Sequence, residues 1–195
     1  MDYFEVVKKR QSIRAFQNRP IEDGKLHRII EAVSLAPSAG DLQAYEIVIV
    51  KDSRRKKALA KAAWEQSFIA EAPVCLVFLA HPRRSSGKYG QRGSELYSLQ
   101  DATIAATFAH LTATALGLGS TWVGAFDDAA VANAVDASRE TRPIAILPIG
   151  YPAETPQLTP RRAVGEILSS EISGMPYHFS FTDESFERPT WKPNF

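Results

Sequence analysis

Two arginines and a serine alternate near the start of the chain, and these residue types at this spacing could bind an anion. In an extended segment, successive side chains point to opposite faces, so Arg10, Ser12 and Arg14 would line one face while Gln11 and Ile13 line the other. Guanidinium groups match phosphate oxygens two at a time, and a nearby hydroxyl can add a further donor. This face is therefore a candidate site for a phosphate monoester. The alternative is an edge strand whose polar face is simply solvated.

The other reactive side chains form no catalytic or metal-binding pattern. The histidines are scattered (His27, His81, His110 and His178), with no H-x-x-x-H or C-x-x-C spacing, so no metal site is predicted. Cys75 lies in an apolar run and is expected to be a buried thiol instead of a nucleophile. No serine stands in G-x-S-x-G, which argues against hydrolysis. Arginines combined with turns that present backbone N–H groups favour a cofactor that carries its own chemistry.

A glycine-rich stretch, 117–126, follows the longest helical pattern of the chain. A dinucleotide-binding fingerprint would need a strand before its first glycine, a helix after it and a glycine at position 122. Here a helix is predicted before the stretch, and Trp122 stands at the third place. The Rossmann interpretation is therefore rejected, and no phosphate-loop signature occurs in the sequence.

Length and charge limit the classes of function. A chain of 195 residues fits one domain that can bury a core without disulfides. The formal net charge of +1 gives no overall field to attract nucleic acid or anionic lipid, and the basic run 54–57 would wrap around a helix as a solvated surface. The acidic start lacks the layout of a signal peptide, and no apolar run is long enough for a membrane helix. A single cysteine is compatible with the cytoplasm, which is the predicted location.

Hydrophobic periodicity predicts the elements that position these residues. Helices are expected over 2–9, from 21 to Pro37, after 52–53, over 94–116 and over 127–135, and strands over 45–50, 73–80 and 142–150. The strand 73–80 is apolar throughout and should lie inside a sheet, whereas Pro143 and Pro148 should leave the last ladder incomplete. The polar, glycine-rich segment 82–93 reads either as a mobile flap over a site or as a surface loop.

Ordered motifs from Phe4 to about Glu166 resemble the FMN-dependent nitroreductase family in its compact form of about 190 residues. The motifs are K-R-Q-S-I-R-A-F at 9–16, A-P-S-A-G-D-L-Q at 36–43, E-A-P-V at 71–74, G-L-G-S-T-W-V-G-A-F at 117–126, P-I-G-Y-P at 148–152, and Arg161. Each motif is weak by itself. Their common order carries the assignment.

The resemblance implies an α+β, three-layer fold with a mixed four- to five-stranded sheet flanked by helices, in an intertwined homodimer with FMN at the interface. Arg10, Ser12, Arg14 and Arg161 would hold the phosphate and ribityl end, and Arg14 could reach the pyrimidine edge. Pro37 and Ser38 would come from the neighbouring subunit. The full predicted cofactor-binding set is Arg10, Gln11, Ser12, Arg14, Pro37, Ser38, Asp41, Gln43, Trp122, Val123, Gly124 and Arg161. The reacting group would be flavin N5, facing a main-chain N–H near Gly124, with no catalytic side chain.

The domain would span 1–173. Residues 174–195, rich in aromatic side chains, would form an extension wrapped over the domain or a partner subunit. Two departures from the family pattern occur: Asp41 replaces the usual asparagine, and Ala44-Tyr45 replaces a common Pro-Trp. An ionised Asp41 cannot donate a hydrogen bond and would oppose a reduced, anionic flavin.

The predicted activity is transfer of hydride from NAD(P)H through FMN to an acceptor such as a nitroaromatic or a quinone. Alternatives are the same scaffold with other flavin chemistry (dehalogenation, azoline oxidation or flavin cleavage) and a flavin-binding protein without turnover. The segment 82–98 is expected to decide among the enzymes, because in this fold it would overlie the ring.

Overall fold

The computed structural model describes residues 1–177, which fall into two compact units. The first unit is Met1–Thr155, and the second begins at Pro156. The boundary at 173/174 stays a prediction. Most of the aromatic extension, from His178 to Phe195, lies outside the described residues.

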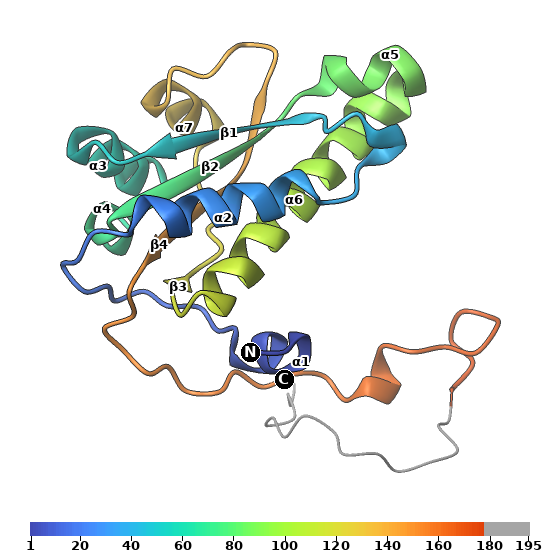
Figure 1. Cartoon of the computed structure of the whole chain (residues 1–195). Helices are drawn as coiled ribbons and strands as arrows, with labels where there is room; N and C mark the ends of the chain where they lie inside the picture. The colour runs from blue at the N-terminus through green and yellow to red at the C-terminus, as the bar shows by residue number, and fades with distance from the viewer. Residues whose placement is uncertain (178–195) are drawn as a thin grey trace. The chain divides into compact units, whose positions relative to one another are not determined.

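The first unit is built on a four-stranded sheet of order β1-β2-β4-β3 (Figure 1). Its strands are β1 (Tyr45–Val50), β2 (Val74–Ala80), β3 (Gly119–Ser120) and β4 (Arg142–Gly150), and all three ladders are antiparallel. The predicted mixed sheet is therefore wrong. Among the described residues, parallel pairing is confined to an isolated bridge between Ser12 and Ser120, because the segment around Ser12 pairs at single positions instead of forming a strand.

Strand β2 lies inside the sheet and is buried along its whole length, as its continuous apolar sequence predicts. Successive side chains alternate between two cores. Leu76 and Phe78 face the core that includes helices α2 (Asp23–Ser34) and α6 (Ser98–Ala115). Cys75 and Val77 face the core that includes α3 (Ser53–Ala62), α4 (Phe68–Glu71) and α7 (Asp128–Ala134). The predicted three layers are thus present, with helices on both faces of the sheet (Figure 1).

Local capping explains where several helices begin. Asp52 accepts the N–H groups of Arg54 and Arg55 and starts α3, and Asp127 accepts the N–H of Ala130 and starts α7. Helix α1 (Tyr3–Lys9) begins with a capping box formed by Asp2 and Glu5. These helix starts agree with the sequence patterns.

Helix α6 packs closely against the sheet because its inner face is mostly alanine. Its alanines at 102, 105, 106, 109 and 113 are fully buried. The helix ends before Gly117, whose φ of +75° places it in the left-handed region that glycine adopts readily.

The segment 82–93 is neither a flap nor a loop, which corrects the prediction. It forms helix α5 (Pro82–Arg92), followed by a π-helical turn, η2 (Gly93–Tyr97), that continues into α6. A Cβ on Gly93 would lie 2.6 Å from the carbonyl oxygen of Ser85, so this glycine allows a close backbone approach. Close backbone packing therefore accounts for the glycine at this position.

The two prolines of β4 behave differently. The register between β2 and β4 shifts at Phe78/Leu79, where Leu79 pairs with Pro143, so the predicted irregularity occurs there. Pro148 lies opposite Cys75 within continuous register.

Two short 3₁₀ turns complete the description, η1 (Ala39–Asp41) and η3 (Val164–Glu166). Within residues 1–177, no helix is both long and apolar enough to span a membrane.

Candidate functional site

The arginine segment lies beside the glycine-rich stretch 117–126. Arg10 caps the C-terminus of α1, and its N–H donates to the carbonyl of Val6 at 2.9 Å. The N–H of Ile13 donates to the carbonyl of Ser120 at 3.0 Å. A Cβ at Gly119 would lie 2.8 Å from Ile13, so glycine permits this approach. Two of the predicted site segments are therefore held together by backbone contacts.

The predicted alternation of faces holds for the residues after Ser12. Ile13 is buried and Arg14 is exposed. The Arg14 side chain makes no hydrogen bond or ion pair with any part of the chain that the structure describes. Its backbone N–H donates to the carboxylate of Glu154, as does the N–H of Ala15 at 2.9 Å. Glu154 thus fixes the backbone here and leaves the Arg14 guanidinium directed into solvent.

Arg10 contacts a buried histidine that the sequence patterns did not single out. Its Nη1 lies 3.0 Å from Nε2 of His110, and Nδ1 of His110 lies 2.5 Å from Oγ of Ser120. Burial, and secondarily the charge of Arg10, lowers the pKa of His110 from 6.5 to about 4. His110 is therefore neutral near pH 7. We call this chain of contacts the Arg10–His110–Ser120 relay.

The stretch 117–126 presents a ring and a backbone donor to solvent. Val123 is anchored on β4, because it exchanges two backbone hydrogen bonds of 3.0 Å with Ile146. Trp122 is 36% exposed, and its Nε1 would lie 3.1 Å from a Cβ at Gly124. Gly124 is exposed, and its N–H has no hydrogen-bond partner within residues 1–177. It can therefore donate to a ligand.

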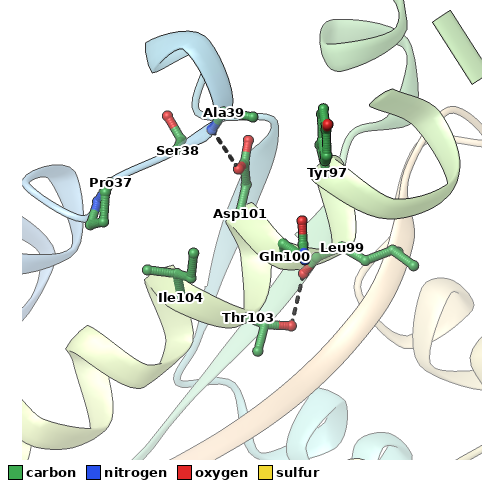
Figure 2. Close-up of a pocket in the computed structure, with 9 residues that line it drawn as sticks. All are labelled: Pro37, Ser38, Ala39, Tyr97, Leu99, Gln100, Asp101, Thr103 and Ile104. Carbon is green, nitrogen blue, oxygen red and sulfur yellow. Dashed lines mark hydrogen bonds between the residues drawn. The ribbon is translucent and has the colours of Figure 1, made fainter. Parts of the chain in front are cut away.

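The loop that carries Pro37, Ser38 and Asp41 is held by a buried carboxylate on α6. Asp101, only 2% exposed, accepts the N–H of Ala39 at 2.9 Å (Figure 2). It also accepts the N–H of Ala44 at 3.2 Å. Oγ of Ser38 accepts the N–H of Gln43 at 3.0 Å. This loop therefore has a defined shape without a ligand.

The same loop contains strained backbone. Asp41 and Gln43 have φ values of 60° and 45°, although neither is glycine. Gly40, beside them, has a φ of 59°. Left-handed conformations of other residues cost energy and are concentrated at functional sites. Asp41 itself is exposed.

A pocket of about 540 Å³ opens between this loop and α6. Figure 2 shows Pro37, Ser38 and Ala39 on one side and residues of η2 and α6 on the other. The η2 and α6 residues that line it are Tyr97, Leu99, Gln100, Asp101, Thr103 and Ile104. Tyr97, near the end of the segment 82–98, thus lines this pocket.

The loop and the relay contact α6 at separate places. Asp101 and His110 are nine residues apart in sequence, which is about 14 Å along a helix axis and about half a turn around it.

Arg161 belongs to the second unit, where its Nη1 donates to the carbonyls of Thr159 and Pro160.

Asp101 and His110 are the site residues that sequence reasoning missed. Both are buried polar residues that flank the alanine-rich face of α6 on either side, and a buried polar side chain is expected to be hydrogen-bonded. That signal was available in the helical pattern. Their partners were not, because they lie about 60 and 100 residues away in sequence.

A family model described as the nitroreductase family matches residues 7–67 and 64–151 of the chain. The chain is 32% identical over 173 residues to an NADH dehydrogenase of Thermus thermophilus, covering 75% of this chain and 84% of the relative. It is also 32% identical over 173 residues to an FMN reductase [NAD(P)H] of Bacillus subtilis, covering 80% and 70%.

The fold is likewise similar to solved structures. The NADPH:FMN oxidoreductase of Vibrio harveyi, in complex with NAD⁺, superimposes with a TM-score of 0.79 at 26% identity. That match covers 87% of this chain and 76% of the other. The similarity therefore extends across the sheet and its covering helices.

Proposed function

The chain belongs to the nitroreductase family and is an oxidoreductase of that family, and from this premise we propose that it binds FMN and transfers electrons from NAD(P)H to a small organic acceptor. The observation that carries the proposal is the pairing of two segments: the arginine segment 10–14 lies against the stretch 117–126. One segment supplies cations, and the other supplies an aromatic ring and a backbone N–H. A phosphorylated, planar cofactor matches this combination.

The donor and acceptor set fits FMN. Arg10 and the exposed Arg14 supply guanidinium groups for the phosphate and for polar edges of the ring. Oε1 of Gln11 is buried and has no hydrogen-bond partner among residues 1–177. Such an atom needs a donor, and the ribityl hydroxyls of FMN can supply one. We assign Ser12 to the phosphate and ribityl end because it stands between Arg10 and Arg14 in the same segment.

Bound FMN would supply the redox chemistry, accepting hydride at N5 and returning two electrons to the acceptor. The chain orients it. Gly124 would offer its N–H to N5, and the hydrogen bonds between Val123 and Ile146 hold the neighbouring backbone in place. Trp122, which is 36% exposed, would lie along the ring. Arg14 at the pyrimidine edge would favour negative charge there.

Two copies of the chain would complete the site as a homodimer. Pro37, Ser38, Asp41 and Gln43 approach α6 near Asp101, away from the relay, so we assign them to the flavin held by a second subunit. The outer face of α6 is suited to this contact. Thr103 and Thr107 are exposed, and their hydroxyls bond to carbonyls within the helix at 2.8 and 2.9 Å, leaving methyl groups outward.

The dimer is tested by gel filtration with light scattering. We expect twice the chain mass of 21.5 kDa and a shift toward monomer in Thr107→Lys, with Lys57→Glu as a surface control. A monodisperse monomer that binds one FMN per chain would contradict the shared site. The predicted cytoplasmic location is part of the same proposal, since it provides NAD(P)H.

The function is tested by the absorbance spectrum of the purified protein and by titration with FMN. We expect about one FMN per chain, and weaker binding of riboflavin because it lacks the phosphate that the arginines recognise. Equal affinity for FMN and riboflavin would refute the phosphate assignment. Absence of flavin binding would refute the proposed function.

A further inference from the structure

The Arg10–His110–Ser120 relay lies behind the proposed phosphate site and joins three elements: the end of α1, helix α6 and strand β3. His110 and Ser120 are 7% and 1% exposed, so their polar atoms must find partners inside the protein. Ser120 serves twice, since its Oγ contacts His110 and its carbonyl accepts the N–H of Ile13. The relay therefore fixes both the side chain of Arg10 and the backbone that follows it.

The contacts determine which tautomer His110 adopts. A guanidinium has donors and no acceptor, so Nε2 of His110 must be the unprotonated nitrogen that accepts from Arg10. Nδ1 then carries the proton and donates to Oγ of Ser120 at 2.5 Å. Every polar atom of the ring is satisfied in the neutral form.

A neutral acceptor differs from a carboxylate in a way that matters for anion binding. A carboxylate beside Arg10 would form an ion pair and oppose an incoming phosphate, whereas neutral imidazole adds no negative charge. The imidazole accepts one N–H of the Arg10 guanidinium and so fixes the plane in which the other donors of that guanidinium lie.

We propose that His110 is a positioning residue, which orients the guanidinium of Arg10 for the phosphate of FMN while leaving its positive charge in place. This inference rests on the proposed function, because it requires FMN as the ligand. The alternative is that the hydrogen bonds of His110 serve only to satisfy a buried polar side chain in the core. That alternative predicts loss of stability and equal effects on all flavins.

Two neutral substitutions separate these roles. In His110→Gln, the longer side chain can still present an amide oxygen to Arg10. In His110→Asn, the shorter side chain can serve Ser120 but ends short of Arg10. Affinities for FMN and riboflavin are measured by quenching of flavin fluorescence, and their ratio reports phosphate recognition alone. Thermal unfolding of each variant reports stability separately.

For His110→Asn we expect the preference for FMN over riboflavin to fall by about tenfold, the scale of one hydrogen bond to a charged group. His110→Gln should retain the preference within about threefold. In the Arg10→Ala background, His110→Asn should have no further effect on the ratio, because the group it orients is gone.

An unchanged ratio in His110→Asn would overturn the inference, as would an equal loss of affinity for both flavins. If His110→Asn does not fold, Ser120→Ala is measured in its place. This substitution removes the partner of Nδ1, so the ratio of FMN to riboflavin affinity should fall by about threefold. An unchanged ratio would again overturn the inference. A wild-type protein that binds no FMN would refute the proposed function and this inference together. Normal binding by wild type with an unchanged variant ratio refutes the inference alone.

Discussion

Replacing Asp101 by asparagine tests whether one buried carboxylate holds the loop 37–44. The wild-type carboxylate accepts two backbone N–H groups, from Ala39 at 2.9 Å and from Ala44 at 3.2 Å. Asparagine offers a single acceptor oxygen, so its NH₂ group must face one of these donors. One N–H then loses its partner in a site that is 2% exposed.

The magnitude follows from these contacts. A hydrogen bond to a charged acceptor contributes about 1.5–3 kcal/mol, and leaving a buried donor unpaired costs about 1–3 kcal/mol. Because these two effects overlap, we expect Asp101→Asn to lower the free energy of unfolding by about 2–4 kcal/mol. The strained residues Asp41 and Gln43 lie between the two anchored positions, so FMN affinity should fall as well.

The assay is urea unfolding followed by circular dichroism, with Asp127→Asn as the matched control. Asp127 is exposed and accepts one N–H, from Ala130 at 2.8 Å, and asparagine caps helices as well as aspartate does. The control should change the free energy of unfolding by less than about 0.5 kcal/mol. Equal, small effects of both substitutions would refute the reasoning.

Three further predictions address charge. Arg10→Ala should weaken FMN binding by about 1.5–3 kcal/mol without unfolding the chain, measured as flavin retained after gel filtration; full retention would remove the phosphate assignment. Because burial lowers the pKa of His110 from 6.5 to about 4, the unfolded chain takes up this proton first as the pH falls. This group should thus destabilise the fold by about 3 kcal/mol between pH 6.5 and 4, and His110→Gln should lack that portion of the acid slope. Asp41→Asn should raise the two-electron potential of bound FMN slightly, because the exposed carboxylate is screened; identical potentials in a redox titration against a reference dye would show that Asp41 does not tune the flavin.

Local patterns predicted the layers of the fold well. The apolar run 74–80 indicated a strand covered on both faces, and β2 is buried throughout. The alanine spacing of α6 and the aspartates at 52 and 127 marked a buried helix and two helix starts. These features depend on neighbours within a few residues, which the sequence displays directly.

Features that depend on distant contacts were harder to predict. Glycines made the segment 82–93 look irregular, although Gly93 serves a close approach to Ser85 inside a helical structure. The antiparallel order of the sheet and the partners of Asp101 and His110 join residues far apart in the chain. Periodicity carries no information about such pairs.

The most direct test of the proposed function is anaerobic mixing of the FMN-loaded protein with NADH or NADPH. We expect that at least one nucleotide removes the absorbance of oxidised flavin and that a nitroaromatic or quinone then restores it. FMN that stays bound and oxidised in the presence of both nucleotides would contradict the proposed electron transfer from NAD(P)H.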